Sequence, residues 1–350
     1  MIDGGVDGMS KREKIVGHIE ELIKSGQLKK GDKIPSEYAL AELFAVNTKT
    51  ANLAVSTLVS KGLLKRLSGA AGTIVAKGGF YPQGTLTYLT CLGQYHNFWA
   101  KLLKGAQKAA LMREYALQYT ECEPRDLKSL YAKLADYGIK GLLASSYGII
   151  DDELPFPIVH VDWLPPEGSS CDYVTSDNCF GGHLATEHLL GLNHRDIVFV
   201  IETSNFNSPT IMERRDGVVR ALEEAGITGA ADRIFHSSSN CAATLREIKS
   251  KYPRFTGILC DSDSLAIRMM DYFLKNGIRV PEEVSIVGCG GALTRGMPSM
   301  KITSVEQFPE DMGFYACNAL VDVVEGKRTG TIAEKLPVEL FLGDSTKTVR

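Results

Sequence analysis

The amino-acid sequence predicts an α/β protein: an N-terminal winged helix-turn-helix domain, then a two-lobed domain with parallel sheets. Two short amphipathic helices, a glycine stop and a hairpin follow one another between Ser36 and Val75. A Gly- and Pro-containing segment then gives way, from Thr85 onward, to alternating strand-like and helix-like segments. With 350 residues, 44% of them hydrophobic, the chain can build more than one core.

The stretch from Ser36 to Gly72 predicts a DNA-reading unit. Ser36 can cap a first helix that ends after Phe44, and a second helix begins near Asn47 or Thr48. Apolar residues recur in the second helix at helical spacing and face inward: Ala51, Ala54, Val55 and Leu58. Its opposite face carries small polar and basic side chains, which suit a helix lying in the major groove.

Gly62 is expected to end the second helix, and segments 63–66 and 72–75 are expected to form two strands joined by a wing at 69–72. An earlier helix, from Ser10 to about Ser25, would pack beneath this unit. One amphipathic helix alone would favour a structural module with a solvated polar face, but the full order of elements favours DNA binding. The residues expected to contact DNA are Lys11, Ser36, Glu37, Asn47, Thr48, Lys49, Thr50, Asn52, Arg66, Gly72 and Thr73.

Charge is distributed unevenly along the chain. Residues 1–78 contain 12 Lys and Arg against 8 Asp and Glu, a net charge of +4, whereas the remainder carries a net charge of −7. Only the N-terminal part is therefore suited to a polyanion. This balance supports the helix-turn-helix prediction without replacing it.

The expected domains are a disordered segment 1–9, a DNA-binding domain 10–77, a linker 78–84 and an effector-binding and dimerisation domain 85–350. With neither a signal peptide nor a bilayer-length apolar run, a cytoplasmic protein with no membrane partner is expected. The eight cysteines form no CxxC pair, and His183 and His188 lie five residues apart, about 140° around a helix. No metal site and no cofactor are expected.

The alternation after Thr85 falls into two sets, which imply two lobes with helices on both faces of parallel sheets. The second set opens with a helix over 181–192, a strand over 197–201 and a helix over 212–225. Ligands of open parallel sheets bind beyond the carboxyl ends of the strands. The loops after these strands are therefore where a site is expected.

Two family resemblances follow from specific motifs. The run Gly31-Asp32-Lys33-Ile34-Pro35-Ser36-Glu37, with Leu40-Ala41, Gly62-Leu63-Leu64 and Gly72-Thr73, resembles the GntR family of bacterial regulators over residues 11–77. The second resemblance is to the LacI-family effector domain over residues 86–342, and it implies a periplasmic-binding-protein-like fold. It is carried by Asp177-Asn178, Arg214-x-x-Gly217, Asp261-Ser262-Asp263 and Pro281-Glu282-Glu283-Val284-Ser285-Ile286-Val287-Gly288. This pairing is similar to the arabinose repressor class. Thr48 and Asn52 stand where the GntR family usually has arginines. The aspartate that the LacI family has after the Val-Gly strand is missing, since this sequence reads Gly288-Cys289-Gly290-Gly291.

A sugar offers hydroxyls and apolar C–H faces, so its site needs carboxylates, amides or Arg together with aromatic rings. Near the predicted strand ends, the residues expected to bind the effector are Tyr95, Phe98, Trp99, Ser145, Asp162, Trp163, Asp177, Phe206, Arg214, Ser262, Asp263 and Gln307. The LacI resemblance implies that Asp162, Arg214, Ser262 and Gln307 contact the ligand. Alternative roles stay open: Trp99 could be core, and Asp177 and Asp263 could cap helices.

The sequence therefore predicts a sequence-specific transcriptional regulator, a repressor, whose DNA binding is controlled by a small ligand, expected to be a sugar. Its expected partners are a double-stranded DNA operator, the effector and a second copy in a homodimer. The alternatives are a cytoplasmic solute-binding protein and a carbohydrate-active hydrolase using Asp162 and Asp177. Because neither a phosphate-binding glycine loop nor a GxSxG motif is present, we expect no enzymatic activity and no catalytic residue.

Overall fold

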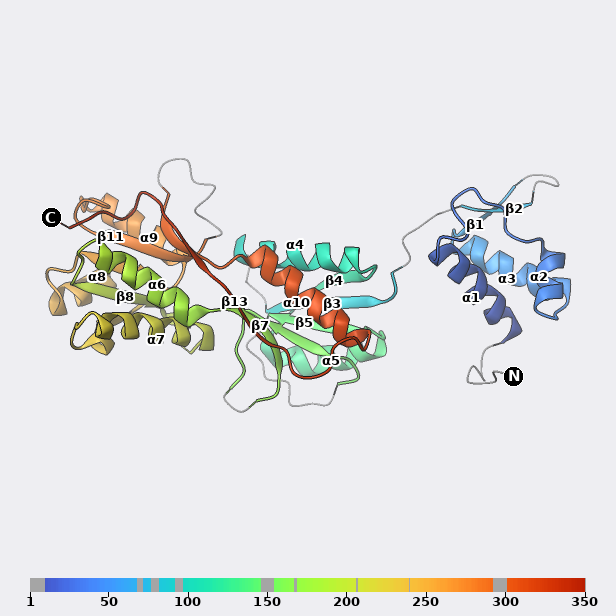
Figure 1. Cartoon of the computed structure of the whole chain (residues 1–350), viewed down its shortest axis with the longest axis horizontal. Coiled ribbons are helices and arrows are strands. Elements are labelled where there is room, and N and C mark those ends of the chain that lie inside the picture. The colour runs from blue at the N-terminus through green and yellow to red at the C-terminus, as the bar shows by residue number, and fades with distance from the viewer. Residues whose placement is uncertain are drawn as a thin grey trace. The chain divides into compact units, whose positions relative to one another are not determined.

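The computed structural model in Figure 1 describes residues 10–67, 72–76, 82–91, 97–145, 154–166, 169–205, 207–238, 240–291 and 301–349. The predicted disordered segment 1–9, the wing tip at 69–71 and residues 78–81 of the predicted linker lie outside these ranges. The chain divides into two compact units at Gln83–Gly84. Within the described ranges, no helix combines the length and the apolar character needed to cross a bilayer.

The first unit, here called the head, is a winged helix-turn-helix. It contains α1 (Lys11–Lys24), α2 (Glu37–Leu43), α3 (Thr48–Ser60) and an antiparallel pair of strands, β1 (Leu64–Arg66) and β2 (Thr73–Val75). Ser10, Ser36 and Asn47 cap the three helices, because each side chain accepts a hydrogen bond from the backbone N–H three residues later. Between the helices lies an apolar core that includes the fully buried Ile19 and Leu40.

The second unit has two lobes, each a six-stranded sheet. The first lobe has strand order β13-β7-β6-β5-β3-β4, and all of its described pairs are parallel. It comprises β3 (Thr85–Cys91), α4 (Asn97–Met112), β4 (Ala116–Cys122), α5 (Leu127–Asp136), β5 (Gly141–Ser145), β6 (Ile158–Val161), β7 (Asp172–Ser176), α10 (Pro309–Val324) and β13 (Ala333–Leu336). Helices α4 and α10 pack on one face of this sheet and α5 on the other.

The second lobe has strand order β14-β12-β11-β10-β8-β9. It comprises α6 (Asn178–Gly191), β8 (Ile197–Glu202), α7 (Pro209–Glu224), β9 (Ile234–Ser237), α8 (Cys241–Lys251), β10 (Gly257–Cys260), α9 (Asp263–Lys275), β11 (Ser285–Gly290), β12 (Thr303–Glu306) and β14 (Glu339–Phe341). Helices α8 and α9 cover one face of the sheet, and α6 and α7 cover the other. Short 3-10 turns lie at Pro124–Asp126, Thr203–Asn205 and Ala230–Arg233.

The chain crosses between the lobes at 176–178, 306–309 and 336–339. Parallel pairing was predicted for both sheets, but β14 runs antiparallel to β12. The last crossing explains this exception. The other strands of the second lobe run toward the first lobe, whereas β14 enters from the first lobe and therefore runs the opposite way.

Two helices begin three residues earlier than the sequence predicts. Helix α6 starts at Asn178 rather than 181, because the Asp177 carboxylate accepts the N–H of Phe180 at 2.9 Å and caps it. Helix α7 starts at Pro209 rather than 212, since proline fits the first turn, where its missing N–H costs nothing. These shifts bring Asn178 into the first turn of α6.

Glycines set two close helix crossings in this unit. A Cβ atom added at Gly105 of α4 or Gly313 of α10 would lie 1.8 or 1.9 Å from a backbone oxygen of the partner helix. In the second lobe, a Cβ at Gly182 of α6 would lie 2.0 Å from the Arg214 oxygen, and one at Gly217 of α7 would lie 1.9 Å from the Cys179 oxygen. These backbones could not approach so closely with any larger residue.

We expect Gly217→Ala to lower the free energy of unfolding by about 3 kcal/mol or more, because the methyl group would force α6 and α7 apart. The matched control is Gly191→Ala near the end of α6, where an added Cβ meets nothing within 4 Å. Urea unfolding followed by circular dichroism measures both variants. Equal stability of the two variants would contradict the proposed tight crossing.

Candidate functional site

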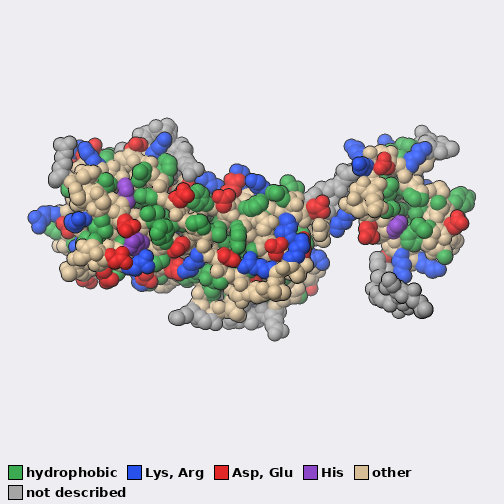
Figure 2. All heavy atoms as spheres, in the orientation of Figure 1, with side chains coloured by type: hydrophobic (Ala, Val, Ile, Leu, Met, Phe, Trp, Pro, Cys, Tyr) green, Lys and Arg blue, Asp and Glu red, His purple; other side chains and the backbone are tan. Residues whose placement is uncertain are grey.

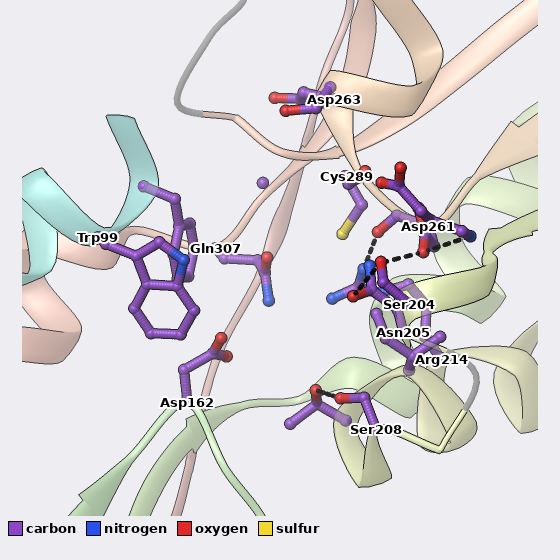
Figure 3. A pocket seen from close by; sticks show the side chains of 17 residues that line it. Trp99, Asp162, Ser204, Asn205, Ser208, Arg214, Asp261, Asp263, Cys289 and Gln307 are labelled. Atoms are coloured by element: carbon purple, nitrogen blue, oxygen red, sulfur yellow. Dashed lines mark hydrogen bonds between the residues drawn. The ribbon is translucent and has the colours of Figure 1, made fainter. Parts of the chain in front are cut away.

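A cavity of about 240 Å³ lies where strand ends of the two lobes meet (Figure 3). The first lobe contributes Phe98 and Trp99 from the start of α4, and Asp162, which directly follows β6. Gln307 belongs to the crossing segment between β12 and α10. The second lobe contributes Glu202, Ser204, Asn205, Ser208, Thr210, Ile211, Arg214, Asp261, Ser262, Asp263, Ser264, Cys289 and Gly290.

The structure brings seven of the predicted effector residues into this lining: Phe98, Trp99, Asp162, Arg214, Ser262, Asp263 and Gln307. Tyr95 and Phe206 lie outside the described residues. Three others have different surroundings. Ser145 is buried and bonds the Tyr88 hydroxyl at 2.8 Å, Trp163 packs on His160 with ring centroids 4.4 Å apart, and Asp177 caps α6.

Aromatic rings form one wall of the cavity. Phe98 and Trp99 pack edge to face with ring centroids 5.4 Å apart, and both remain partly exposed. In Figure 3 the Trp99 ring faces the cavity from one side, while Arg214 lies on the other. An aromatic face opposite a polar wall suits a ring with apolar C–H faces and polar edges.

Arg214 is held in place from two sides, although it is only 6% exposed. Its Nη2 group donates to Oδ1 of Asn178 at 2.6 Å, and Nη1 donates to the backbone oxygen of Asp261. The same Asn178 oxygen accepts a bond from Gln307 Nε2 at 3.4 Å. One amide thus joins the pocket arginine to two of the segments that cross between the lobes.

Asp162 has an unusual backbone and an unusual pKa. Its φ of 51° is rare outside glycine, and its N–H donates to the Val174 oxygen at 2.9 Å. Its Oδ1 atom is buried without a hydrogen-bond partner among the described residues. Burial raises the pKa of Asp162 to about 7, although the nearby positive charge of Arg214 acts in the opposite direction.

Asp263 lies where glycines leave room for it. Its Oδ1 atom accepts a bond from Ser304 Oγ at 2.6 Å and would lie 2.4 Å from a Cβ atom at Gly288. Gly290, in the segment where the aspartate of the LacI resemblance is missing, has a φ of 124°, a conformation that other residues rarely adopt. The Asp263 carboxylate at this end of the cavity comes from the first turn of α9.

Sequence reasoning missed several polar residues of the lining. Glu202 ends β8 and Asp261 directly follows β10, so the strand-end rule that selected Asp162 could have found both. Asp261 Oδ2 accepts bonds from the Glu202 N–H at 2.9 Å and from Asn205 Nδ2 at 3.0 Å. Among the described residues, no group of three or more His, Cys, Asp or Glu side chains is placed to hold a metal ion.

In the head, some of the residues predicted to contact DNA form hydrogen bonds within the head, and others have exposed side chains. Glu37 accepts bonds from Asn52 Nδ2 and Arg66 Nη2, both at 2.9 Å, and thereby joins α2 to α3 and β1. On the recognition helix α3, Thr48 and Lys49 are exposed. These two side chains are free to meet a duplex, whereas the Asn52 amide is already used within the head.

Most of the remaining residues predicted to contact DNA cap helices or form hydrogen bonds within the head. Ser36 and Asn47 cap helices, and Thr50 Oγ1 donates to Asn47 Oδ1 at 2.8 Å. Lys11 Nζ donates to the Ala45 oxygen at 3.2 Å. Gly72, with a φ of 86°, directly precedes β2, which begins at Thr73. In the second unit, acidic and basic side chains are mixed over the face visible in Figure 2.

We expect the stability of Asp162→Asn to respond differently to pH from that of the wild type. Unfolded Asp162 loses its proton near its ordinary pKa of 3.8, whereas the folded residue keeps it to about pH 7. Raising the pH from 4 to 7 therefore favours unfolding of the wild type, by roughly 3 kcal/mol relative to the variant. Urea unfolding of both proteins across this range measures the difference, and parallel profiles would contradict it.

Comparison with known proteins matches both parts of the chain. Residues 11–75 match the bacterial regulatory proteins of the gntR family, and residues 186–346 match the periplasmic binding protein-like domain. The arabinose metabolism transcriptional repressor of Geobacillus stearothermophilus is 24% identical over 93% of this chain and 95% of that protein. The transcriptional repressor PurR of Aliivibrio salmonicida is 26% identical over 67% of this chain and 73% of the PurR chain.

Among solved structures, a complex of the transcriptional regulator CelR with cellobiose superposes with a TM-score of 0.67 at 21% identity. The superposition covers 89% of this chain and 100% of the CelR chain. At this identity, the likeness shows the fold. Together with the family matches, it confirms the predicted architecture: a winged helix-turn-helix head that matches the gntR family, followed by a periplasmic-binding-protein-like domain.

Proposed function

We propose that this protein is a transcriptional repressor that binds a specific operator through its head and is controlled by a sugar bound in the pocket of its second unit. The observation that carries the proposal is that one chain contains both a winged helix-turn-helix head and a cavity lined by carboxylates, an arginine and aromatic rings. The arabinose metabolism repressor, similar along nearly the whole chain, supports the repressor role.

The lining supports the sugar. Trp99 and Phe98 offer aromatic faces for C–H groups, while Asp162, Arg214 and Gln307 offer acceptors and donors for hydroxyl groups. The buried Oδ1 atom of Asp162 has no partner among the described residues, so a ligand hydroxyl could supply one. The CelR structure of the same fold is a complex with cellobiose.

Asn178 suggests how the ligand could act on DNA binding. Arg214 and Gln307 both donate hydrogen bonds to Asn178, which lies where the chain crosses between the lobes. A sugar that bonds either side chain would therefore change the hydrogen bonding at this crossing. Such a ligand would favour one arrangement of the lobes over another, and only this difference in affinity can shift the equilibrium. In the expected homodimer, the change would alter the spacing of two heads on their half-sites.

The alternative of a carbohydrate-active hydrolase has less support. That hypothesis paired Asp162 with Asp177, but Asp177 caps α6 and is not part of the cavity lining. A plain solute-binding protein would leave the gntR-family head without a role. A regulator uses both parts of the chain.

We expect Lys49→Ala to weaken operator binding and to reduce its salt slope by about 1, because Lys49 is exposed on the recognition helix and would meet a phosphate. The control is Lys24→Ala, at the end of α1. Fluorescence anisotropy on a duplex selected in vitro, titrated at several salt concentrations, measures both. An unchanged affinity and slope would remove Lys49 from the interface.

We expect Arg214→Gln to abolish the ligand response while leaving operator affinity unchanged, because Arg214 lies in the pocket and not in the head. Arg215→Gln is the matched control, since Arg215 is the next residue of α7 and pairs with Asp216 at 2.7 Å. The readout is release of the duplex by a sugar that stabilises the wild type in a thermal-shift screen. Normal release from Arg214→Gln would show that the effector binds elsewhere.

A further inference from the structure

Leu53 is an exposed apolar residue on the recognition helix α3. Its side chain is 46% exposed, whereas Ala54 and Leu58 of the same helix are completely buried in the core of the head. Because residues four apart share a helix face, Leu53 lies beside the exposed Lys49, on the side of α3 that points away from this core. An apolar side chain therefore belongs to the face that a winged helix-turn-helix turns toward DNA.

The polar side chains next to Leu53 are bonded within the head. Asn52 Nδ2 donates to Glu37 Oε2 at 2.9 Å, and Asn52 Oδ1 accepts the Ser56 hydroxyl at 3.4 Å. Arg66 Nη2 donates to Glu37 Oε1 at 2.9 Å and to Ser56 Oγ at 3.1 Å, which closes a ring of four side chains. Asparagine reads adenine with its amide oxygen and nitrogen together. Asn52 could do so only by breaking two bonds of this ring.

Few other groups on α3 can read a base by hydrogen bonding. The 13 residues of the helix include no arginine, the residue that most commonly reads guanine, and a single lysine, Lys49. Thr48 and Lys49 are exposed in the first turn, and Leu53 follows in the second. The N-terminal residues of a recognition helix are those that reach base edges. In its second turn, α3 therefore presents an apolar group to the groove.

Thymine is the base that offers a leucine a favourable contact. Its major-groove edge carries a C5-methyl group, whereas the other three bases present hydrogen-bond donors and acceptors there. A leucine lying over a donor or acceptor would remove it from water without supplying a partner, which is unfavourable. Contact with a methyl group instead removes apolar surface of both partners from water.

We infer that Leu53 reads thymine: it contacts the C5-methyl group of one thymine in each operator half-site, so that an A·T pair occupies this position. The inference rests on the proposed function, since it defines part of the DNA sequence that the head recognises. The net charge of +4 in residues 1–78 and the exposed Lys49 favour DNA over an apolar protein as the partner that covers Leu53. Specificity at this position comes from a methyl group and not from a hydrogen bond.

The test uses the full chain and a duplex that the wild-type protein selects from random DNA. Each thymine of a half-site is replaced in turn by deoxyuridine, which removes the C5-methyl group and keeps the base pair with its hydrogen-bonding groups. We expect one of these replacements to weaken wild-type binding about fourfold per half-site, the factor that burial of one methyl group contributes. Fluorescence anisotropy at constant salt concentration measures the dissociation constants.

Three variants assign the methyl contact to its residue. Leu53→Ala should bind the selected duplex at least about fourfold more weakly and should bind the thymine and deoxyuridine duplexes equally. Leu53→Met keeps an apolar side chain of similar size and should retain the difference between them. The matched control is Leu43→Ala, because Leu43 is a leucine 64% exposed at the end of α2. This control should keep both the wild-type affinity and the sensitivity to deoxyuridine.

Affinity for an unrelated duplex, which depends on phosphate contacts, shows that each variant remains a folded DNA-binding protein. Two outcomes would overturn the inference and leave the proposed function intact. In the first, the wild type is insensitive to deoxyuridine at every thymine of the half-site, or selects a half-site without thymine. In the second, the sensitivity persists in Leu53→Ala, which assigns the methyl contact to another residue. If selection enriches no sequence at all, the specific operator of the proposed function fails together with this inference.

Discussion

The hydrogen bond between Arg214 and Asn178 is the interaction on which the second unit depends. A buried guanidinium needs acceptors, and the Asn178 oxygen at 2.6 Å supplies one of the two found here. Because Asn178 lies at one crossing between the lobes and also bonds Gln307 at another, the bond connects the ligand cavity with segments that must bend if the lobes move. In the proposed function, ligand recognition and movement of the lobes would therefore both involve the Asn178 amide.

The helix crossing beneath this bond makes it possible. Asn178 begins α6, Arg214 belongs to α7, and Gly182 and Gly217 allow the two backbones to touch. The oxygen that would lie 2.0 Å from a Cβ at Gly182 belongs to Arg214 itself. The approach of the backbones therefore sets the distance between the polar side chains. An apolar packing constraint thus determines the geometry of a polar site.

The fold was largely predictable because its signals are local. Caps such as Ser36 and Asn47 define the head, and alternating apolar segments define both lobes. Strand β13 was missed because its residues, Ala-Glu-Lys-Leu, show no apolar alternation and gain their place by pairing with β7. In the site, strand ends indicated Asp162. The next residue, Trp163, packs on His160, and Asp162 has a left-handed backbone; the strand-end pattern predicted neither feature.

The chain contains two tryptophans, and both belong to the first lobe. Trp99 borders the cavity, whereas Trp163 is 5% exposed and packs on His160. Neither the head nor the second lobe contributes an indole to the emission spectrum. Intrinsic fluorescence is therefore a built-in optical probe of the first lobe, and quenching or a blue shift reports a change beside the cavity without any attached dye.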